Sequence, residues 1–543
     1  MHPDVGTDSV VGADEEVAAD RGDRKREFTM AQDVGRWWQE AVIYQIYPRS
    51  FADSNHDGVG DLPGIAAQLD HISALGADAV WISPVYRSPM ADAGYDISDH
   101  CDIDPTFGTL ADMDRIIEQA HARGLRVLLD FVPNHTSDEH PWFRDARSSR
   151  DSPRRDWYIW RDEPNNWRAA LGAGSAWTWD ELTEQYYLHL FLPAQPDLNW
   201  RNPEVVEAMH GVLRFWLDRG VDGFRIDVVH CIAKDPTFAD SERCAAGEPL
   251  VSFNDQPYTH ELLRGIRQVI DSYPGDRVLV GEVNIRSTKS VAEYYGAGDE
   301  LQMAFNFPPL DAPWDPVALR MCVRDVEESL GEVSAWPTWV LSNHDNARHR
   351  TRYDGSLRRA RAAAVLLLTL RGTPFLFQGE ELGLEDAEIG REEQVDPGGR
   401  DGARAPLPWL SEPPHGWQGA RTWLPFPPEA GALAVQSQEG RADSVLHLYR
   451  RLTTERRASP ALRTGSWTEL DTPPEVLAYR RSSDGDVRVV AVNFADRRIE
   501  LALEGEWSVA VASDDPVDDA LWSGLLQPEQ AVVLRPGHAG RSR

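Results

Sequence analysis

Charged, imidazole and amide side chains stand at the ends of several apolar runs in this chain of 543 residues. These positions are Asn134 and His135, Arg225 and Asp227, Glu282, and His344 and Asp345. A carboxylate at the end of an apolar strand is costly to bury unless a partner satisfies it. One such residue can belong to a structural ion pair, but three carboxylates with two histidines and an arginine favour a reactive site.

Three convergent carboxyl groups are suited to cleaving a glycosidic bond. One carboxylate attacks the anomeric carbon and forms a glycosyl ester. A second carboxyl group, kept protonated by like charge and partial burial, protonates the leaving oxygen and later activates water. The third can hold sugar hydroxyls and favour an oxocarbenium-like transition state.

The apolar runs that would position these residues alternate with amphipathic helical stretches. Helices are predicted from Thr109, with Asp112 in a capping box, and from Asn202, with Pro203 at its first position. Strands are predicted at residues 41–48, 79–84, 126–135, 223–229, 277–283, 302–307, 339–345 and 373–381. Eight near-continuous apolar strands alternating with helices predict an α/β fold, a (β/α)₈ TIM barrel. No GxGxxG turn follows the first strand to favour a nucleotide-binding sheet.

The pattern changes at three places along the chain. Residues 1–33 are polar and acidic, which predicts a disordered N-terminal tail. Residues 34–135 and 199–460 would form the barrel, and residues 136–198, rich in Trp, Arg and Pro, would form an inserted lobe after the third strand. Short alternating runs in residues 461–543 predict a C-terminal antiparallel β domain.

Composition disfavours several classes of partner. The formal net charge of −33 disfavours nucleic acid and anionic membrane surfaces. The chain has no apolar run of about 18 residues and no basic segment leading into an apolar one, so neither a membrane span nor a secretory signal is expected. Four cysteines without CxxC spacing predict free thiols. We therefore expect a cytoplasmic monomer or homodimer with a small-molecule substrate.

Four segments resemble short sequence regions of the α-amylase superfamily of glycoside hydrolases. They are DFVPNH (130–135), GFRIDVVH (223–230), GEV (281–283) and SNHDN (342–346), and they occur in the same order. The resemblance extends from Trp37 to the C-terminus. It implies the same architecture of barrel, inserted lobe and C-terminal β domain.

The resemblance also implies roles for individual residues. Asp227 would be the nucleophile, Glu282 the general acid/base and Asp345 the stabiliser of the transition state. Arg225 would hold the nucleophile ionised. The sugar that is cleaved off would be bound through its hydroxyls by His135 and His344.

A closer resemblance is to the oligo-1,6-glucosidase and α-glucosidase group. It is carried by QPDLNW (195–200), GYDISDH (94–100) and GRDGAR (399–404), whereas APLPW (405–409) departs from the group's TPMQW. The resemblance implies that Tyr95 stacks on the first glucose, that Asp96 binds its outer hydroxyls, and that Arg400 pairs with Asp96. A pocket closed in this way would take only the non-reducing end of a sugar chain. The alternative for Arg400 is that it lies in a solvated loop and takes no part in the pocket.

The loop after the first strand carries oxygen ligands at alternate positions. They are Asp53, Asn55, Asp57, the carbonyl of Val59, and Asp61. The spacing resembles the first part of an EF-hand loop, but the twelfth position is Gly64 rather than Glu. The resemblance to the group implies a structural Ca²⁺, or Mg²⁺, at these residues and no organic cofactor. A polar turn capped by Asp and Asn is the alternative.

The function implied by these resemblances is a retaining α-glucosidase that releases terminal α-linked glucose from short substrates. Val228 follows the nucleophile, and in the group a valine there tends to accompany α-1,6 activity. Transglucosylation and the processing of sucrose or trehalose remain open within the same chemistry. A non-catalytic transporter-associated relative and a sugar-binding module are alternatives from other classes, and the intact carboxylates disfavour both.

Overall fold

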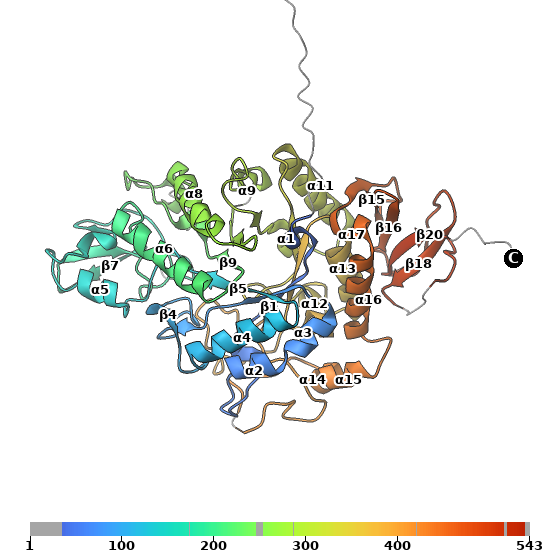
Figure 1. The fold of residues 1–543 in the computed structure, drawn as a ribbon, viewed down its shortest axis with the longest axis horizontal. Coiled ribbons are helices and arrows are strands. Elements are labelled where there is room, and N and C mark those ends of the chain that lie inside the picture. Colours follow the sequence, from blue (N-terminus) through green and yellow to red (C-terminus); the bar gives the residue numbers. More distant parts are fainter. Residues whose placement is uncertain are drawn as a thin grey trace, which may run out of the picture.

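A computed structural model describes residues 35–172, 174–245, 254–285, 287–419, 421–514 and 519–537. The tail predicted at residues 1–33 lies outside these ranges. At the centre of the molecule is a sheet of eight parallel strands (Figure 1). In sheet order these are β11 (Met303–Ala304), β10 (Val278–Gly281), β9 (Gly223–Ile226), β5 (Arg126–Phe131), β2 (Ala79–Ile82), β1 (Ile43–Ile46), β13 (Thr373–Phe377) and β12 (Thr338–Val340).

Side chains join the two ends of this sheet and close the barrel. The hydroxyl of Thr338 on β12 donates to the carbonyl of Ala304 on β11 at 2.7 Å. The amide of Asn306 donates back to the carbonyl of Thr338 at 3.0 Å. The predicted (β/α)₈ barrel is therefore confirmed. The strand predicted at residues 302–307 is shorter than expected, because Pro308 already begins helix α10 (Pro308–Asp311).

The two helices with sequence-encoded starts form as predicted. In α4 (Leu110–Ala122) the Thr109 hydroxyl accepts from the amide of Asp112, whose carboxylate accepts from the amide of Thr109. In α6 (Pro203–Asp218) the side chain of Asn202 accepts from the amide of Glu204 at 2.8 Å. These and other helices cover the strands, which are buried on both faces as a parallel sheet requires. The other main covering helices are α2 (Leu62–Ala67), α3 (Leu69–Leu75), α8 (Pro257–Asp271), α11 (Pro316–Glu332) and α13 (Leu357–Thr369).

The inserted lobe follows β5 and lies at the left of Figure 1. It contains helix α5 (Pro141–Ala146) and a small antiparallel sheet of β6 (Trp160–Arg161), β8 (Gln185–Leu188) and β7 (Trp177–Asp180). Isolated backbone bridges join His135 to Asp197 and Tyr158 to Leu198. The lobe is thus tied to the segment that leaves the carboxyl end of β5.

The C-terminal part is an antiparallel sheet at the right of Figure 1. Its strands in order are β14 (Ser466–Glu469), β15 (Val476–Ser483), β16 (Asp486–Asn493), β20 (Ala531–Pro536) and β18 (Trp507–Ala512). Helices α16 (Val445–Ala458) and α17 (Pro460–Thr464) lead into it. Arg481 on β15 donates to the carbonyl of Thr369 at 2.5 Å, which fastens the sheet to helix α13 of the barrel.

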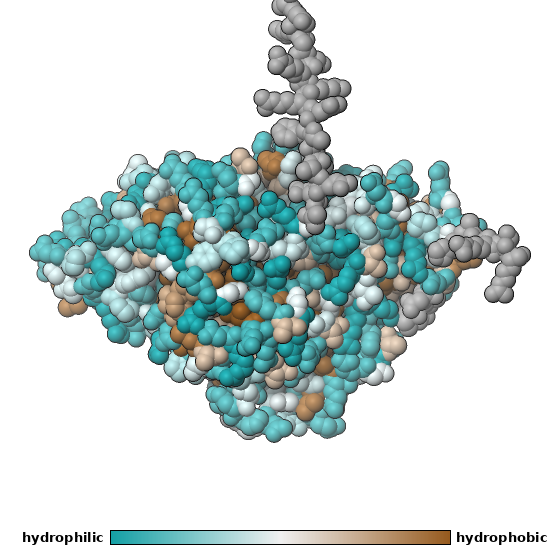
Figure 2. Space-filling view, in the orientation of Figure 1, coloured by the Kyte–Doolittle hydropathy of each residue, from teal (hydrophilic) through white to brown (hydrophobic). Residues whose placement is uncertain are grey.

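The visible face of the molecule is dominated by hydrophilic side chains, with hydrophobic ones scattered among them (Figure 2). Across the described ranges, every helix is too short or too polar to cross a membrane.

Candidate active site

One buried arginine binds three carboxylates at the carboxyl ends of the barrel strands. The Nη1 atom of Arg225, on β9, lies 2.7 Å from Asp130 Oδ1 and 2.8 Å from Asp227 Oδ1. Its Nη2 atom lies 2.5 Å from Glu282 Oε2. The guanidinium has donors directed from a rigid plane, so it fixes several carboxylates at once.

Strand register explains why Asp227 and Glu282 meet. Ile226 on β9 pairs with Gly281 on β10, and these are the last residues of the two strands. The residues that follow them, Asp227 and Glu282, therefore leave neighbouring parallel strands at the same level. In a barrel this is the end that carries catalytic groups.

Burial and like charge govern the titration of this cluster. Burial raises the pKa of Asp227 well above its ordinary range; Arg225 opposes this, while Glu282 and Asp130 add to it. Burial also raises the pKa of Asp130 to about 6. Burial alone would lower the pKa of Arg225, but Asp130, Glu282 and Asp227 hold it well above its usual value. Arg225 thus favours ionisation of Asp227, but burial outweighs it, so the arginine alone does not hold this carboxyl group ionised as the resemblance implied.

The third carboxylate, Asp345, lies among cationic and imidazole groups. Its Oδ1 atom is 2.9 Å from Arg400 Nη1 and 3.0 Å from Arg404 Nη2, and its Oδ2 atom is 3.2 Å from His344 Nε2. Burial alone would raise the pKa of Asp345, but His344, Arg400 and Arg404 together hold it well below its usual range. This carboxylate is therefore ionised across the neutral range.

His344 is held between a glutamine and a tyrosine. Its Nδ1 atom lies 2.8 Å from the amide nitrogen of Gln45 on β1, and its Nε2 atom lies 2.6 Å from the hydroxyl of Tyr95. The rings of His344 and Tyr95 stack with centroids 5.4 Å apart and planes 5° from parallel. Burial lowers the pKa of His344 to about 3, so the imidazole is neutral near pH 7.

These groups surround a small pocket of about 70 Å³. Six of the predicted site residues line it: Tyr95, His135, Asp227, Glu282, Asp345 and Arg400. The remaining lining residues are Asp92, Leu171, Phe191 and Val228. Leu171 and Phe191 come from the inserted lobe, so the lobe covers the mouth of the barrel.

The predicted pairing of Arg400 with Asp96 is wrong. Arg400 Nη2 lies 2.6 Å from Asp92 Oδ1. The fully buried carboxylate of Asp96 instead accepts from the amides of Ala91 and Asp92 at 2.8 and 2.9 Å, and from Ser88 Oγ at 2.9 Å. Because those bonds fold the loop, Asp96 presents Asp92 to the pocket and does not line the pocket itself.

The segment QPDLNW contributes to the pocket through Gln195. The amide nitrogen of Gln195 lies 3.0 Å from Asp92 Oδ2 and 3.1 Å from His135 Nε2. Two residues further on, Asp197 forms a buried ion pair with Lys234 at 2.8 Å. Burial lowers the pKa of His135 to about 3, so this histidine is also neutral near pH 7.

Sequence reasoning missed Asp92, Asp130, Gln45 and Gln195. Asp130 opens the segment DFVPNH, and Trp81 donates to its second oxygen at 2.9 Å. Asp92 stands three residues before Tyr95. Both aspartates therefore lie in or beside segments that carry the family resemblance, whereas nothing in the local sequence distinguishes Gln45.

Val228 adopts a left-handed backbone conformation beside the reacting groups. Its φ angle is 34°, which is strained for a β-branched residue. Its amide donates to Glu282 Oε2 at 3.2 Å, and its side chain belongs to a hydrophobic cluster with residues of the lobe. The strained turn after β9 therefore supplies a backbone donor to Glu282.

The predicted metal loop is shaped by bonds to its own backbone. Asp53 accepts from the amides of Asn55, His56 and Gly58, and Asp61 caps helix α2 by accepting from the amide of Gly64 at 2.7 Å. Oxygen donors of the kind that Ca²⁺ prefers are present. Within the described residues, however, no three His, Cys, Asp or Glu side chains are grouped closely enough to hold a metal ion.

Comparisons with known proteins agree with this geometry. The family description "Alpha amylase, catalytic domain" matches residues 45–465. A probable alpha-glucosidase of Rhizobium meliloti is 42% identical, with 90% of this chain and 96% of that protein covered. An oligo-1,6-glucosidase of Parageobacillus thermoglucosidasius is 38% identical over 85% of this chain and 91% of that protein.

Among solved structures, the alpha-glucosyl transfer enzyme XgtA has a TM-score of 0.86 and 42% sequence identity, covering 92% of this chain and 100% of its own. The barrel, the lobe, the strand-end carboxylates and these relatives lead to one conclusion. The chain belongs to the alpha-amylase family and is a glycoside hydrolase.

Proposed function

We propose that this chain is a retaining, exo-acting α-glucosidase that releases the terminal α-linked glucose of di- and short oligosaccharides. The observation that carries the proposal is the Arg225 guanidinium, which contacts Asp227 through one terminal nitrogen and Glu282 through the other. This keeps the two carboxyl groups close, as a covalent mechanism needs; an inverting mechanism separates them by about 6.5–9.5 Å to admit water.

In the proposed reaction, Asp227 attacks the anomeric carbon and forms a covalent glucosyl ester. Glu282 donates a proton to the leaving oxygen, then accepts one from the water that hydrolyses the ester. Asp345, held ionised by Arg400 and Arg404, binds ring hydroxyls and stabilises positive charge at the anomeric carbon. Both anomeric substitutions invert the configuration, so the released glucose has the α configuration.

The shape of the pocket supports exo action. Its volume of about 70 Å³ is closed on one side by Asp92 and Arg400, which are 2.6 Å apart. The lobe residues Leu171 and Phe191 also line it. A small pocket that is blocked on one side by this ion pair favours binding of the end of a sugar chain over its interior.

Transfer of glucose to another sugar is a second candidate activity. It is favoured by the 42% identity to an alpha-glucosyl transfer enzyme over 92% of this chain. The glucosyl ester on Asp227 is common to both reactions, and they differ in whether water or a sugar hydroxyl attacks it. The ratio of transfer products to free glucose at high substrate concentration distinguishes the two.

The test is to incubate the enzyme separately with maltose, isomaltose, sucrose and trehalose and to follow the anomers of released glucose by NMR. We expect α-glucose first. Asp227→Asn should abolish turnover of every substrate, whereas Glu282→Gln should retain activity on a glucosyl fluoride and be rescued by azide. Asp70→Asn, at an exposed carboxylate on α3, is the matched control. Initial release of β-glucose, or rapid loss of viscosity in starch, would contradict the proposal.

We propose that the loop at residues 53–61 takes up Ca²⁺, or Mg²⁺, as a structural ion, supported by the donor set Asp53, Asn55, Asp57, the Val59 carbonyl and Asp61. We also propose that the enzyme acts in the cytoplasm as a monomer or homodimer. The free thiols of Cys101, Cys231 and Cys322 support a reducing location.

A further inference from the structure

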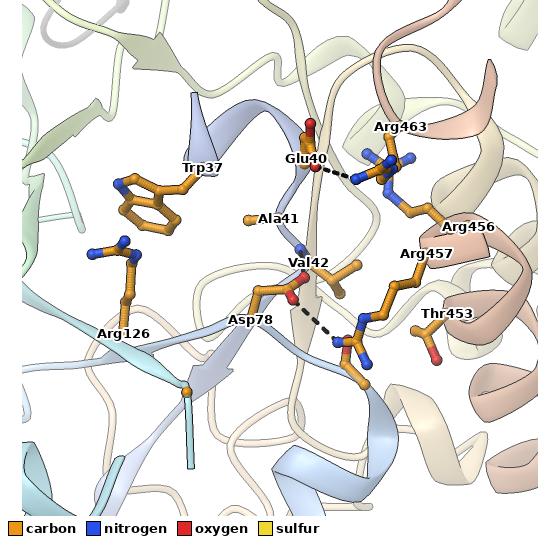
Figure 3. A pocket seen from close by; sticks show the side chains of 12 residues that line it. Trp37, Glu40, Ala41, Val42, Asp78, Arg126, Thr453, Arg456, Arg457 and Arg463 are labelled. Atoms are coloured by element: carbon orange, nitrogen blue, oxygen red, sulfur yellow. Dashed lines mark hydrogen bonds and ion pairs between the residues drawn. The ribbon is translucent and has the colours of Figure 1, made fainter. Parts of the chain in front are cut away.

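A second and larger pocket lies at the other end of the barrel. It has a volume of about 320 Å³ and is drawn in Figure 3. Val42 precedes β1, Asp78 precedes β2 and Arg126 begins β5, so the pocket opens at the amino ends of these strands. The catalytic groups lie at the carboxyl ends. Helices α16 and α17 form the opposite wall.

The lining of this pocket is rich in arginine. Arg126, Arg456, Arg457 and Arg463 line it, together with the carboxylates Glu40 and Asp78. Figure 3 shows Arg126 beside Trp37 on one side, and Arg456, Arg457 and Arg463 on the other. Four cations and two anions leave a formal excess of two positive charges in the lining. That excess stands out in a chain whose net charge is −33.

Two of these arginines are paired within the pocket. Arg463 Nη1 lies 2.5 Å from Glu40 Oε2, and Arg457 Nη2 lies 3.1 Å from Asp78 Oδ1. The side chains of both pairs are partly exposed to solvent, so a ligand in the pocket can reach them. A guanidinium has five N–H donors, and one carboxylate contact leaves others available to a second anion.

Arg456 is a buried cation without a carboxylate partner among the described residues. It is 1% exposed. Its terminal nitrogens donate to the carbonyls of Leu368, Leu462 and Gly372 at 3.2, 3.0 and 2.7 Å, while its Nε atom has no partner in the described parts of the chain. Burial lowers the pKa of Arg456 to about 10, and the nearby charges of Asp78 and Glu40 offset this only in part. An anion in the pocket would offset this unfavourable environment.

Arg126 is also only partly neutralised. Its guanidinium lies 4.5 Å from the ring centroid of Trp37. Its carboxylate contact, to Asp222 at 3.3 Å, is shared with Arg277 at 2.5 Å and His121 at 2.7 Å. The Asp222 carboxylate is therefore shared by three basic side chains, and Arg126 receives only part of its charge.

We propose that the arginine-lined pocket is a binding site for a small polyanion that carries phosphate or carboxylate groups. Guanidinium groups bind both kinds of oxyanion through paired N–H donors. The volume is within the range of small-molecule pockets, about 300–1,000 Å³. Such a ligand would join the starts of β1, β2 and β5 to helices α16 and α17. Its main effect is to stabilise the junction between the barrel and the C-terminal sheet.

The test is calorimetric titration of the full chain with pyrophosphate, glucose 6-phosphate and citrate, with ionic strength held constant by sodium chloride. We expect one saturable site per chain and a raised melting temperature for at least one probe. The three probes distinguish phosphate from carboxylate as the preferred group. A parallel titration contains excess glucose, which fills the catalytic pocket. Probe binding that persists in that titration therefore belongs to the second site.

Variants at the exposed arginines identify the site. The double variant Arg457→Gln/Arg463→Gln should bind about tenfold more weakly or worse, corresponding to the loss of at least one charge-assisted contact. Its hydrolytic activity should be unchanged. Arg144→Gln is the control, because Arg144 is about as exposed as Arg457 and has its own ion pair at 3.1 Å. Absence of saturable binding by all three probes, or equal binding by the double variant, would overturn the proposal.

Discussion

The Nη1 atom of Arg225 lies 2.8 Å from the Oδ1 atom of Asp227, two residues further along the chain. The same guanidinium holds Glu282 through its other terminal nitrogen. One cation thus touches both carboxyl groups that the proposed reaction uses. It favours the ionised form of Asp227 and fixes the separation of the pair.

Arg225→Lys should therefore cost activity although it keeps the positive charge. An ammonium group is a point charge and lacks the two separate terminal nitrogens that hold Asp227 and Glu282. We expect kcat/KM to fall by about 100-fold or more, comparable to the loss of a preorganised donor in an active site. Arg264→Lys, at a half-exposed arginine paired with Glu300, is the control. A wild-type kcat/KM for Arg225→Lys would contradict this role.

The acid limb of the activity profile should depend on Asp130. Asp227 must lose its proton to attack, and its raised pKa means that activity grows as pH rises through that value. The negative charge on Asp130 contributes to the raised pKa of Asp227. Asp130→Asn removes that charge and lowers the pKa of Asp227, so the acid limb of kcat/KM should move to lower pH.

A profile of kcat/KM between about pH 4 and 8 measures this shift. Asp70→Asn should leave the limb in place, because Asp70 lies exposed on helix α3. A limb that moves to higher pH in Asp130→Asn would show that the carboxylate of Asp130 acts differently, for example by positioning Arg225 alone.

Removal of the ion by a chelator should lower the melting temperature but not the catalytic activity at low temperature. The loop at residues 53–61 connects β1 to α2 and contributes no residue to the lining of the catalytic pocket. If it holds Ca²⁺ in the folded state only, removing the ion lowers the melting temperature by mass action and leaves activity at low temperature largely intact. Asp53→Ala should gain nothing from added Ca²⁺, and it should melt at or below the temperature of the chelated wild type, because it also loses the bonds from the amides of Asn55, His56 and Gly58. An unchanged melting temperature in chelator would exclude a structural ion at this loop.

Residues that directly follow a strand were the most predictable part of the site. Asp227 and Glu282 end apolar runs, and parallel register then brings them together without further information. Helix starts were equally predictable, because the bonds that define them join residues two or three positions apart, as at Thr109 and Asn202.

Contacts decided by loop shape or by closure of the barrel were not predictable. Asp92 and Asp96 both stand close to Tyr95, and the turn at Ala91 decides which of the two accepts backbone amides. Asp130 lies within a strand that is buried on both faces, so alternation gives no sign of its role. The arginine-lined pocket joins residues more than 400 positions apart, such as Glu40 and Arg463, which only the closed barrel brings together.

Asp92 and Asp96 should respond differently to the loss of their charge. Asp92 contacts Arg400 and Gln195 and lines the pocket, so Asp92→Asn should weaken recognition of the terminal glucose. Loss of a charge-assisted contact predicts a fall in kcat/KM of about 10- to 100-fold on maltose and isomaltose. The melting temperature of Asp92→Asn should change little. Burial raises the pKa of Asp92, which means that its negative charge is costly in the folded state, so replacing it by a neutral amide removes that cost.

Asp96→Asn should behave in the opposite way. An amide has one acceptor oxygen, whereas the two oxygens of Asp96 accept three bonds that fold the loop. The variant should therefore lose about 1–3 kcal/mol in its free energy of unfolding, with any loss of activity following from displacement of Asp92. Denaturant unfolding and kcat/KM, measured on both variants, separate the two roles. If Asp96→Asn lost activity at full stability while Asp92→Asn remained fully active, Asp96 rather than Asp92 would be the residue that meets the sugar.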